Sequence, residues 1–485
     1  MKNSPNLHDV VYSVLLTQIR FGAYRCAEKL PTIEETSAQL HVSVATARCA
    51  YLKLKEQGYI SLSKNVGATV KANYTSQETE QFIQAFFSAR RTAMTDLGKS
   101  LRPLFGNVQW VGLKSACSET LLAIEALAGA EHVAAPYAML EHLNQKYSVL
   151  GNSLLMRLTR QTFLFLHAPF FSIKENLQYF DQFADYLPQV LALCRSKDWP
   201  ALRAVMDRSI DKLSLALDRF YASRITPPSP EEEISFAWSS YQKSDQLCYS
   251  LAMELLISIS RGIYPAGSLL PSQAELASQK GVSVSTVRRA LSLLGSVGAI
   301  RSAQYVGTRV LPLHKATENS DFSNPALQRR LLDMAESLHI FALSCREVSL
   351  LTLSSPGSDM AGRLCGELKA RKQWRRGEVL SYFLLDFLAQ NAPYQAIRTV
   401  YSELRRQFFW AYALRGMEGS QAQINALYDP YFDALIGALE KEDASRFSAV
   451  VEELAVSELL RTVELLSQLG VPGANALLLP NAAGA

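Results

Sequence analysis

Two segments of this 485-residue chain repeat each other without a gap at an offset of 240 positions. LPTIEETSAQLHVSVATARCAYLKLKEQGYI begins at Leu30, and LPSQAELASQKGVSVSTVRRALSLLGSVGAI begins at Leu270. The match extends upstream to Gly22 and Gly262, and downstream to VGATV and VGTRV. Chance does not hold one register over such a length, so the chain contains two copies of one small module.

Each copy predicts three helices closed by a β-hairpin. The first, amphipathic helix covers about residues 8–21 in copy one and 245–261 in copy two. A hydroxyl with a glutamate three residues later then forms a capping box, which begins the second helix. These pairs are Thr32 with Glu35 and Ser272 with Glu275. The second helix ends near Leu40 or Lys280, and Ser43 or Ser283 is placed to cap the third.

The third helix has one apolar stripe and one face left free. The stripe follows the spacing i, i+3, i+4, i+7. It consists of Ala47, Ala50, Tyr51 and Leu54 in copy one and of Val287, Ala290, Leu291 and Leu294 in copy two. The free face carries Val44, Ala45 and Arg48, or Val284, Ser285, Arg288 and Arg289. Two short strands around a glycine follow, which completes a winged helix-turn-helix.

The free face of the third helix suits the major groove of B-DNA, which accepts one α-helix. Arginines can bind guanine edges or phosphates there, and hydroxyls at the helix N-terminus suit phosphate. The predicted DNA-binding residues are Ser43, Ala45, Thr46, Arg48, Lys64, Ser283, Ser285, Thr286, Arg288, Arg289 and Arg309, with Asn65, Arg301, Gln304 and Tyr305 as further wing residues within reach. The alternative is that the module contacts protein, and that the arginines form a merely solvated face.

Charge is concentrated in the two copies. Residues 1–72 carry a net charge of +4 and residues 243–315 carry +5, which leaves −5 for the rest of the chain. Two short basic segments in an otherwise acidic chain favour local contact with a polyanion. We therefore expect double-stranded DNA as the partner.

The motifs resemble the GntR family of bacterial regulators, whose head pattern is L-P-S-x-x-x-L-A, then V-S-x-x-T-V-R-x-A-L, then G-x-G-T-x-V. Copy two, with LPSQAELA, VSVSTVRRAL and VGTRV, is the closer match. Family members often place arginines where this chain has Glu34 and Ala274, and again after V-S, where it has valines. The arginine of T-V-R is kept as Arg48 and Arg288, and copy one is expected to bind DNA more weakly.

The two long segments between and after the heads are expected to be all-helical. They share a second repeat, a helix, an acidic turn and a helix, from Phe183 and from Tyr428. Asn152 and Asn391 are a further candidate pair. These segments are similar to the helical effector-binding domain called FCD, which often holds a metal with one Asp and three His. That ligand set is not recoverable from His132, His142, His167, His314 and His339, so no metal is predicted, and the effector-binding residues stay unknown.

The expected architecture is mainly α, with two winged helix-turn-helix domains, each followed by an all-helical bundle domain. A Pro-rich, then acidic segment, ITPPSPEEE, reads as the linker between the halves, and the tail is expected to be frayed. The expected order is head 1–72, helical domain 73–222, linker 223–240, head 241–312, helical domain 313–470 and tail 471–485.

Composition excludes several classes of protein. No apolar run approaches the roughly 20 residues that cross a bilayer, and MKNSPNLHDV lacks the apolar region of a secretory signal. The seven cysteines are scattered without a C-x-x-C pair, which argues against disulfides and a thiolate zinc site. We therefore expect a cytoplasmic protein with no membrane partner and no cofactor.

The favoured hypothesis is a sequence-specific transcriptional regulator that responds to a small-molecule effector in its helical domains. Its two heads would act as a pseudo-dimer in one chain, or the chain would form a homodimer. The alternative is an architectural or interaction protein that uses winged helices without an effector. An enzyme is not expected, because a fusion of MocR type needs a large α/β body and a Schiff-base lysine, and the chain has no Gly-rich phosphate loop or nucleophile elbow.

Overall fold

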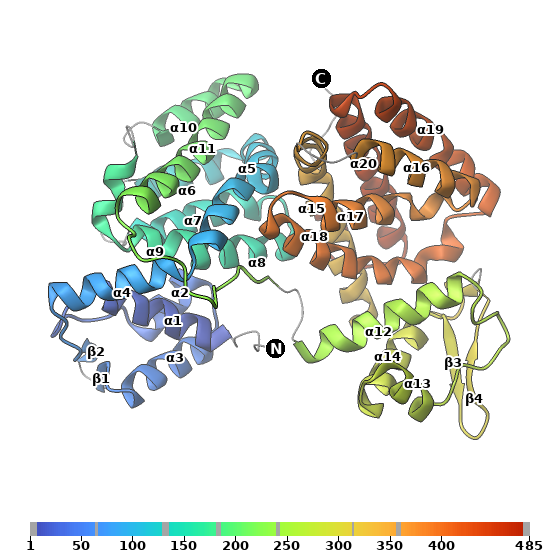
Figure 1. Ribbon diagram of the computed structural model, residues 1–485, viewed down its shortest axis with the longest axis horizontal. Coiled ribbons are helices and arrows are strands. Elements are labelled where there is room, and N and C mark those ends of the chain that lie inside the picture. Colours follow the sequence, from blue (N-terminus) through green and yellow to red (C-terminus); the bar gives the residue numbers. More distant parts are fainter. Residues whose placement is uncertain are drawn as a thin grey trace. The chain divides into compact units, whose positions relative to one another are not determined.

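The computed structural model describes residues 7–63, 66–128, 135–180, 186–238, 243–312, 315–355 and 360–478. Contacts divide the chain into two units (Figure 1). Unit 1 is Met1–Trp238 with Tyr394–Ala396, and unit 2 is Ser239–Pro393 with Ile397–Ala485. None of the described helices has the length and apolar character needed to span a membrane.

Each unit begins with a small head of three helices and a two-stranded antiparallel hairpin (Figure 1). Head 1 consists of α1 Leu7–Arg20, α2 Ile33–Leu40, α3 Val44–Glu56, β1 Ile60–Ser63 and β2 Gly67–Val70. Head 2 consists of α12 Lys243–Ser260, α13 Gln273–Lys280, α14 Val284–Ser296, β3 Ile300–Ala303 and β4 Gly307–Val310. The second and third helices and both strands begin and end at positions 240 apart, which confirms the predicted repeat.

Both heads share the register of their hairpins. Ile60 lies opposite Val70 in head 1, and Ile300 lies opposite Val310 in head 2. Isolated bridges pair Lys29 with Thr69 and Leu269 with Arg309, so the segment that leads into the second helix lies against the hairpin in each head. This is the winged helix-turn-helix that the sequence predicts.

The rest of each unit is helical within the described residues. Unit 1 contains α4 Ser76–Ser88, α5 Arg91–Lys114, α6 Ser118–Ala128, α7 Ala135–Ser148, α8 Ser153–Thr162, η1 Phe163–His167, α9 Ala168–Phe171, η2 Lys174–Tyr179, α10 Tyr186–Ser196 and α11 Trp199–Ser223. Unit 2 contains α15 Pro325–Leu353, α16 Met360–Gln373, η4 Gly377–Val379, α17 Leu380–Asn391, α18 Gln395–Gln407, η5 Phe408–Met417, α19 Gln421–Glu440, α20 Ala444–Gln468 and η6 Ala474–Leu477.

A π-helical turn, η1, joins α8 to α9 in unit 1. Pro169 is the second residue after this turn, and it lacks the N–H that would bond to the carbonyl four residues earlier. At this turn Ala168 N donates to the carbonyl of Phe163, five residues earlier, which is the wider hydrogen bond of a π-helix. This turn carries the buried His167, which stacks on the ring of Phe163 at 5.7 Å.

The second predicted repeat is confirmed in α10–α11 and α19–α20. Each pair is joined by a residue in the left-handed region, Lys197 (φ 56°) or Glu442 (φ 54°). An aspartate then caps the long helix: Asp198 Oδ1 accepts from Ala201 N at 3.1 Å, and Asp443 Oδ1 accepts from Arg446 N at 2.8 Å. The pairing of Asn152 with Asn391 is wrong, because Asn152 caps the start of α8 whereas Asn391 ends α17.

The predicted linker and the predicted tail both contain buried residues. Residues 224–238 have no helix or strand, but Ile225 and Trp238 are buried and Ile234 N donates to the carbonyl of Ala89 at 2.7 Å. The expectation of a frayed tail is wrong for residues 471–478, because Val471 and Leu477 are buried. The rest of the tail, 479–485, lies outside the described residues.

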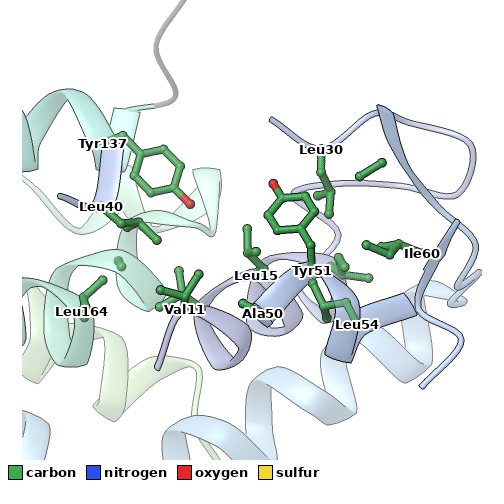
Figure 2. Close-up of a cluster of buried hydrophobic side chains, with 14 of the residues drawn as sticks. Val11, Leu15, Leu30, Leu40, Ala50, Tyr51, Leu54, Ile60, Tyr137 and Leu164 are labelled. Carbon is green, nitrogen blue, oxygen red and sulfur yellow. The ribbon is translucent and has the colours of Figure 1, made fainter. Parts of the chain in front are cut away.

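Head 1 and the helical part of unit 1 share one core. Val11, Leu15 and Leu40 of the head belong to the same buried cluster as Tyr137 of α7 and Leu164 of η1 (Figure 2). The Tyr137 hydroxyl donates to Gln18 Oε1 of α1 at 2.8 Å in a buried setting. Head 1 is therefore joined to the helical part of unit 1 by buried side chains as well as by the connecting backbone.

Candidate nucleic-acid interface

The third helix of each head is fixed at its N-terminus by a serine. Ser43 Oγ accepts from Thr46 N at 3.1 Å, and Ser283 Oγ accepts from Thr286 N at 3.1 Å. The second helix before it ends in a left-handed residue, His41 or Gly281. The capping boxes of the second helices are both complete, as predicted. These caps and the left-handed turn residue together set the angle between the second and the third helix.

The buried stripe of the third helix is confirmed at every predicted position. Ala47, Ala50, Tyr51 and Leu54 are buried in α3, and Val287, Ala290, Leu291 and Leu294 are buried in α14. The opposite face is open in both heads, with Val44 and Val284 each 41% exposed. Neither face is covered by the described parts of its own unit, so both remain available for a partner.

Arg48 and Arg288 project from these open faces. Both side chains are exposed, and within the described residues neither takes part in a hydrogen bond or an ion pair. Ala45, Ser285 and Arg289 are exposed on the same faces. The exposed guanidinium groups of Arg48 and Arg288, which no other group of the described residues binds, can bind a guanine edge or a phosphate.

The predicted hydroxyl contacts serve first as caps. Ser43 Oγ lies 2.8 Å from Thr46 Oγ1, and Ser283 Oγ lies 2.8 Å from Ser285 Oγ and from Thr286 Oγ1. Thr46 and Thr286 are half-buried. These hydroxyls gather where a helix N-terminus favours an anion, so they remain candidates for phosphate contact.

The wing of head 2 is only partly free to reach a partner. Arg309 Nη1 donates to the carbonyl of Gly267 at 2.8 Å, and Arg301 Nη2 donates to Asn319 Oδ1 at 2.8 Å. Tyr305 at the tip is 98% exposed, and Gln304 beside it is exposed. The predicted wing residues of head 1, Lys64 and Asn65, lie outside the described residues.

Val44 and Val284 lie on the free face, as predicted, but they are not among the residues predicted to contact DNA. Their exposure at the N-terminal end of α3 and α14 gives each an apolar group that can meet the methyl group of thymine. The signal was present in the sequence, because both valines fall outside the predicted buried stripe.

The structure describes three of the histidines considered as metal ligands, His142, His167 and His339. Within the described residues, no three His, Cys, Asp or Glu side chains are grouped as metal ligands would be. His167 and His339 are buried, and burial lowers the pKa of each to about 4. Burial also lowers the pKa of His142. His132 and His314 lie outside the described residues.

Comparison with known sequences identifies both heads. The sequence profile of the family described as "Bacterial regulatory proteins, gntR family" matches residues 7–70 and 249–310. An uncharacterized HTH-type transcriptional regulator of Escherichia coli K12, YieP, is 41% identical over 66 residues, which is 14% of this chain and 29% of that protein. The chain thus spans under a third of the length of this curated relative. Both heads are GntR-family domains.

Solved structures of similar proteins include two bacterial regulators. Streptococcus agalactiae GntR is 19% identical with a TM-score of 0.19, and the alignment covers 44% of this chain and 99% of that one. E. coli McbR/YncC is 15% identical with a TM-score of 0.23, covering 45% of this chain and 100% of that one. Likenesses this weak carry no inference about function.

Proposed function

We propose that this chain, with its two GntR-family heads, is a sequence-specific DNA-binding transcriptional regulator. The observation that carries the proposal is the open face of α3 and α14, from which Arg48 and Arg288 project at equivalent positions. A recognition helix needs one buried stripe to hold it and one free face with groups that match base edges. Both helices have this division of faces.

The two heads act together as a pseudo-dimer in this proposal. Helix-turn-helix dimers read two half-sites, with one recognition helix in each. A single chain with two heads carries two such helices without a second subunit. The free faces differ, since Ala45 and Cys49 of head 1 stand where head 2 has Ser285 and Arg289. The expected operator therefore has two unlike halves.

The helical part of each unit is proposed to make the regulator responsive to a small molecule. In unit 1 the buried cluster that joins Leu40 to Tyr137 links head 1 to α7. A ligand that binds one arrangement of the helices better than another would change the population of head positions. The shared core supplies a route by which such a change can reach the head.

Footprinting of the full-length protein on the DNA upstream of its own gene tests the proposal. The expected result is a protected site with two halves of different sequence, at nanomolar affinity that falls as salt rises. A DNA library selected with the protein should return the same two halves. Binding with no preference among sequences would contradict a regulator and favour an architectural protein.

A further inference from the structure

The turn between α2 and α3 is clamped in head 1 by the helical part of the same unit. Arg160 Nη1 of α8 donates to the backbone carbonyl of His41 at 2.7 Å. The His41 ring, on the residue that ends α2, has its Nε2 3.1 Å from Glu141 Oε2 of α7 and also in contact with the amide of Asn144. Three side chains from α7 and α8 therefore hold the residue that sets the direction of α3.

A pocket lies beside this clamp. Its volume is about 320 Å³, and its lining includes His41, Glu141, Asn144, Gln145, Arg157 and Arg160. Small-molecule sites in proteins begin at about 300 Å³, so this pocket suits a ligand of few atoms. It is bounded on one side by the head and on the other by α7 and α8.

Two arginines give the pocket a positive wall. Arg157 and Arg160 are three residues apart in α8, which places them on the same face of the helix. Burial and the charge of Arg157 lower the pKa of Arg160, so an anion close by would stabilise the Arg160 guanidinium. Guanidinium groups bind carboxylate and phosphate oxygens through paired hydrogen bonds.

In the described part of unit 2, no side chain holds the turn of head 2 in the way that His41 is held. The residue that corresponds to His41 is Gly281, which has no side chain to be held. Within the described residues, a Cβ added to Gly281 would meet no atom within 4 Å. Whatever acts at the turn of head 1 therefore does not act in the same way at the turn of head 2.

We infer that the pocket beside His41 binds a small anion with a carboxylate or phosphate group, and that this ligand regulates head 1 alone. The inference rests on the proposed function and names the site and ligand class of its effector. The anion binds Arg157 and Arg160 and competes with the carbonyl of His41 for the Arg160 guanidinium. The turn then loses a hydrogen bond to α8, α3 is held less firmly, and head 1 binds its half-site more weakly.

Calorimetric titration of the full-length chain tests the site directly. Inorganic phosphate and citrate are titrated separately at constant ionic strength, and the titration that gives a saturable heat change, of either sign, identifies the acid group. We expect Arg157→Ala and Arg160→Ala each to weaken binding about tenfold or more. The control is Arg195→Ala, which removes an exposed arginine of the same unit that pairs with Glu125. No binding of either anion, or equal binding by the double arginine variant, overturns the inference.

Hydrogen exchange of wild-type protein tests the clamp without any variant. The anion that binds should raise exchange in the peptide covering residues 33–43 and leave the peptide covering 273–283 unchanged. Equal changes in both peptides, or none in the first, would overturn the regulatory part of the inference.

DNA footprints separate this inference from the proposed function. The anion should weaken protection of the half-site that depends on Arg48 several-fold and leave the half-site that depends on Arg288 unaltered. If both half-sites are protected and the anion changes neither, the inference fails and the proposed function stands. If the protein protects no DNA at all, the proposed function fails, and calorimetry and hydrogen exchange still decide whether the pocket binds the anion and opens the clamp.

Discussion

A Cβ placed on Gly298 would lie 2.2 Å from the carbonyl oxygen of Ala316, closer than real atoms approach. Gly298 connects α14 to β3 in head 2 with a φ of +70°. The corresponding Gly58 of head 1 has a φ of +80°, and a Cβ there would meet no described atom within 4 Å. The two heads thus have the same turn in different surroundings, since within the described residues a Cβ would meet the following chain at Gly298 but not at Gly58.

Alanine at these two glycines should therefore have unequal effects. Gly58→Ala places a side chain in the left-handed region and is expected to cost about 1–2 kcal/mol. Gly298→Ala adds a clash with the backbone of Ala316, which should raise the cost by about another 1–3 kcal/mol. Hydrogen exchange of the amides of α3 and of α14 measures the local loss in each head. Equal losses would show that head 2 can move away from Ala316 without cost.

Substitution of the capping serine separates stability from DNA contact. Ser283→Ala removes the acceptor for Thr286 N and should destabilise head 2 by about 1 kcal/mol. Ser283→Asp keeps an acceptor, so head 2 should stay as stable as in the wild type. Its carboxylate lies at the end of α14 that we propose faces phosphate, so DNA affinity should nevertheless fall. Thermal unfolding and DNA titration, run on the same two variants, give the two readouts.

The result that would contradict the proposed orientation of α14 is Ser283→Asp with normal DNA affinity. Ser43→Asp is the matched variant in head 1, where Ser43 Oγ accepts from Thr46 N. Each aspartate should affect only the half-site of its own head.

The heads could be predicted from sequence because their signals are local. Capping residues, the spacing of the apolar stripe and a glycine or its equivalent at each turn lie within a few positions of the element that they define. The two copies show each of these patterns twice, at an offset of 240 residues. The predicted end of α2 at Leu40 and the predicted cap at Ser43 are both confirmed. The fold class followed from the same patterns.

Contacts between distant residues could not be predicted in this way. His41 meets Glu141, which is 100 positions away, and the only sequence signal was a histidine where copy two has glycine. The segment after Arg224 reads as a linker by composition, yet Ile225 and Trp238 are buried. Leu477 lies in the tail that was expected to be frayed, but it is fully buried. The surface on which an apolar tail residue packs is formed by residues distant in sequence, so local patterns do not predict it.

Loss of the arginine at the centre of each free face should affect one half-site at a time. Arg288→Ala is expected to weaken binding to its half-site by about 1–3 kcal/mol if the guanidinium reads a base. Arg48→Ala should act in the same way on the other half-site. Footprint titrations on an operator with each half mutated in turn measure the two effects. Protein stability should not change, because neither arginine has a hydrogen bond or ion pair within the described residues.

A control distinguishes base reading from general attraction to DNA. Lys55 is exposed in the last turn of α3, at the end opposite to the capping serine. Lys55→Ala should lower affinity little and without preference among sequences. If Arg48→Ala and Arg288→Ala resemble it, both arginines contact phosphate only, and selectivity must come from other residues of the two faces.

Acid should destabilise unit 1 through His167. Burial lowers the pKa of His167 to about 4 in the folded protein, against an ordinary value of 6.5. The unfolded chain therefore binds the proton more tightly, so this contribution to stability is complete above about pH 6.5 and is lost as the pH falls toward 4. The difference between the two pKa values corresponds to about 3 kcal/mol. His167→Phe, which keeps an aromatic ring between Phe163 and Phe171, should remove this pH dependence.

Hydrogen exchange of α8 and α11, compared between wild type and His167→Phe at each pH, measures this effect, because intrinsic exchange rates then cancel. The variant should gain stability relative to the wild type by about 3 kcal/mol between pH 7 and pH 4. His339→Phe is the matched control, because burial lowers the pKa of His339 to about 4 as well, but in unit 2. It should flatten the pH dependence of α15 and leave α8 unchanged. A stability difference in α8 that is constant with pH would mean that His167 accepts a proton inside the folded unit at no cost, and that the aromatic stack around it opens to water.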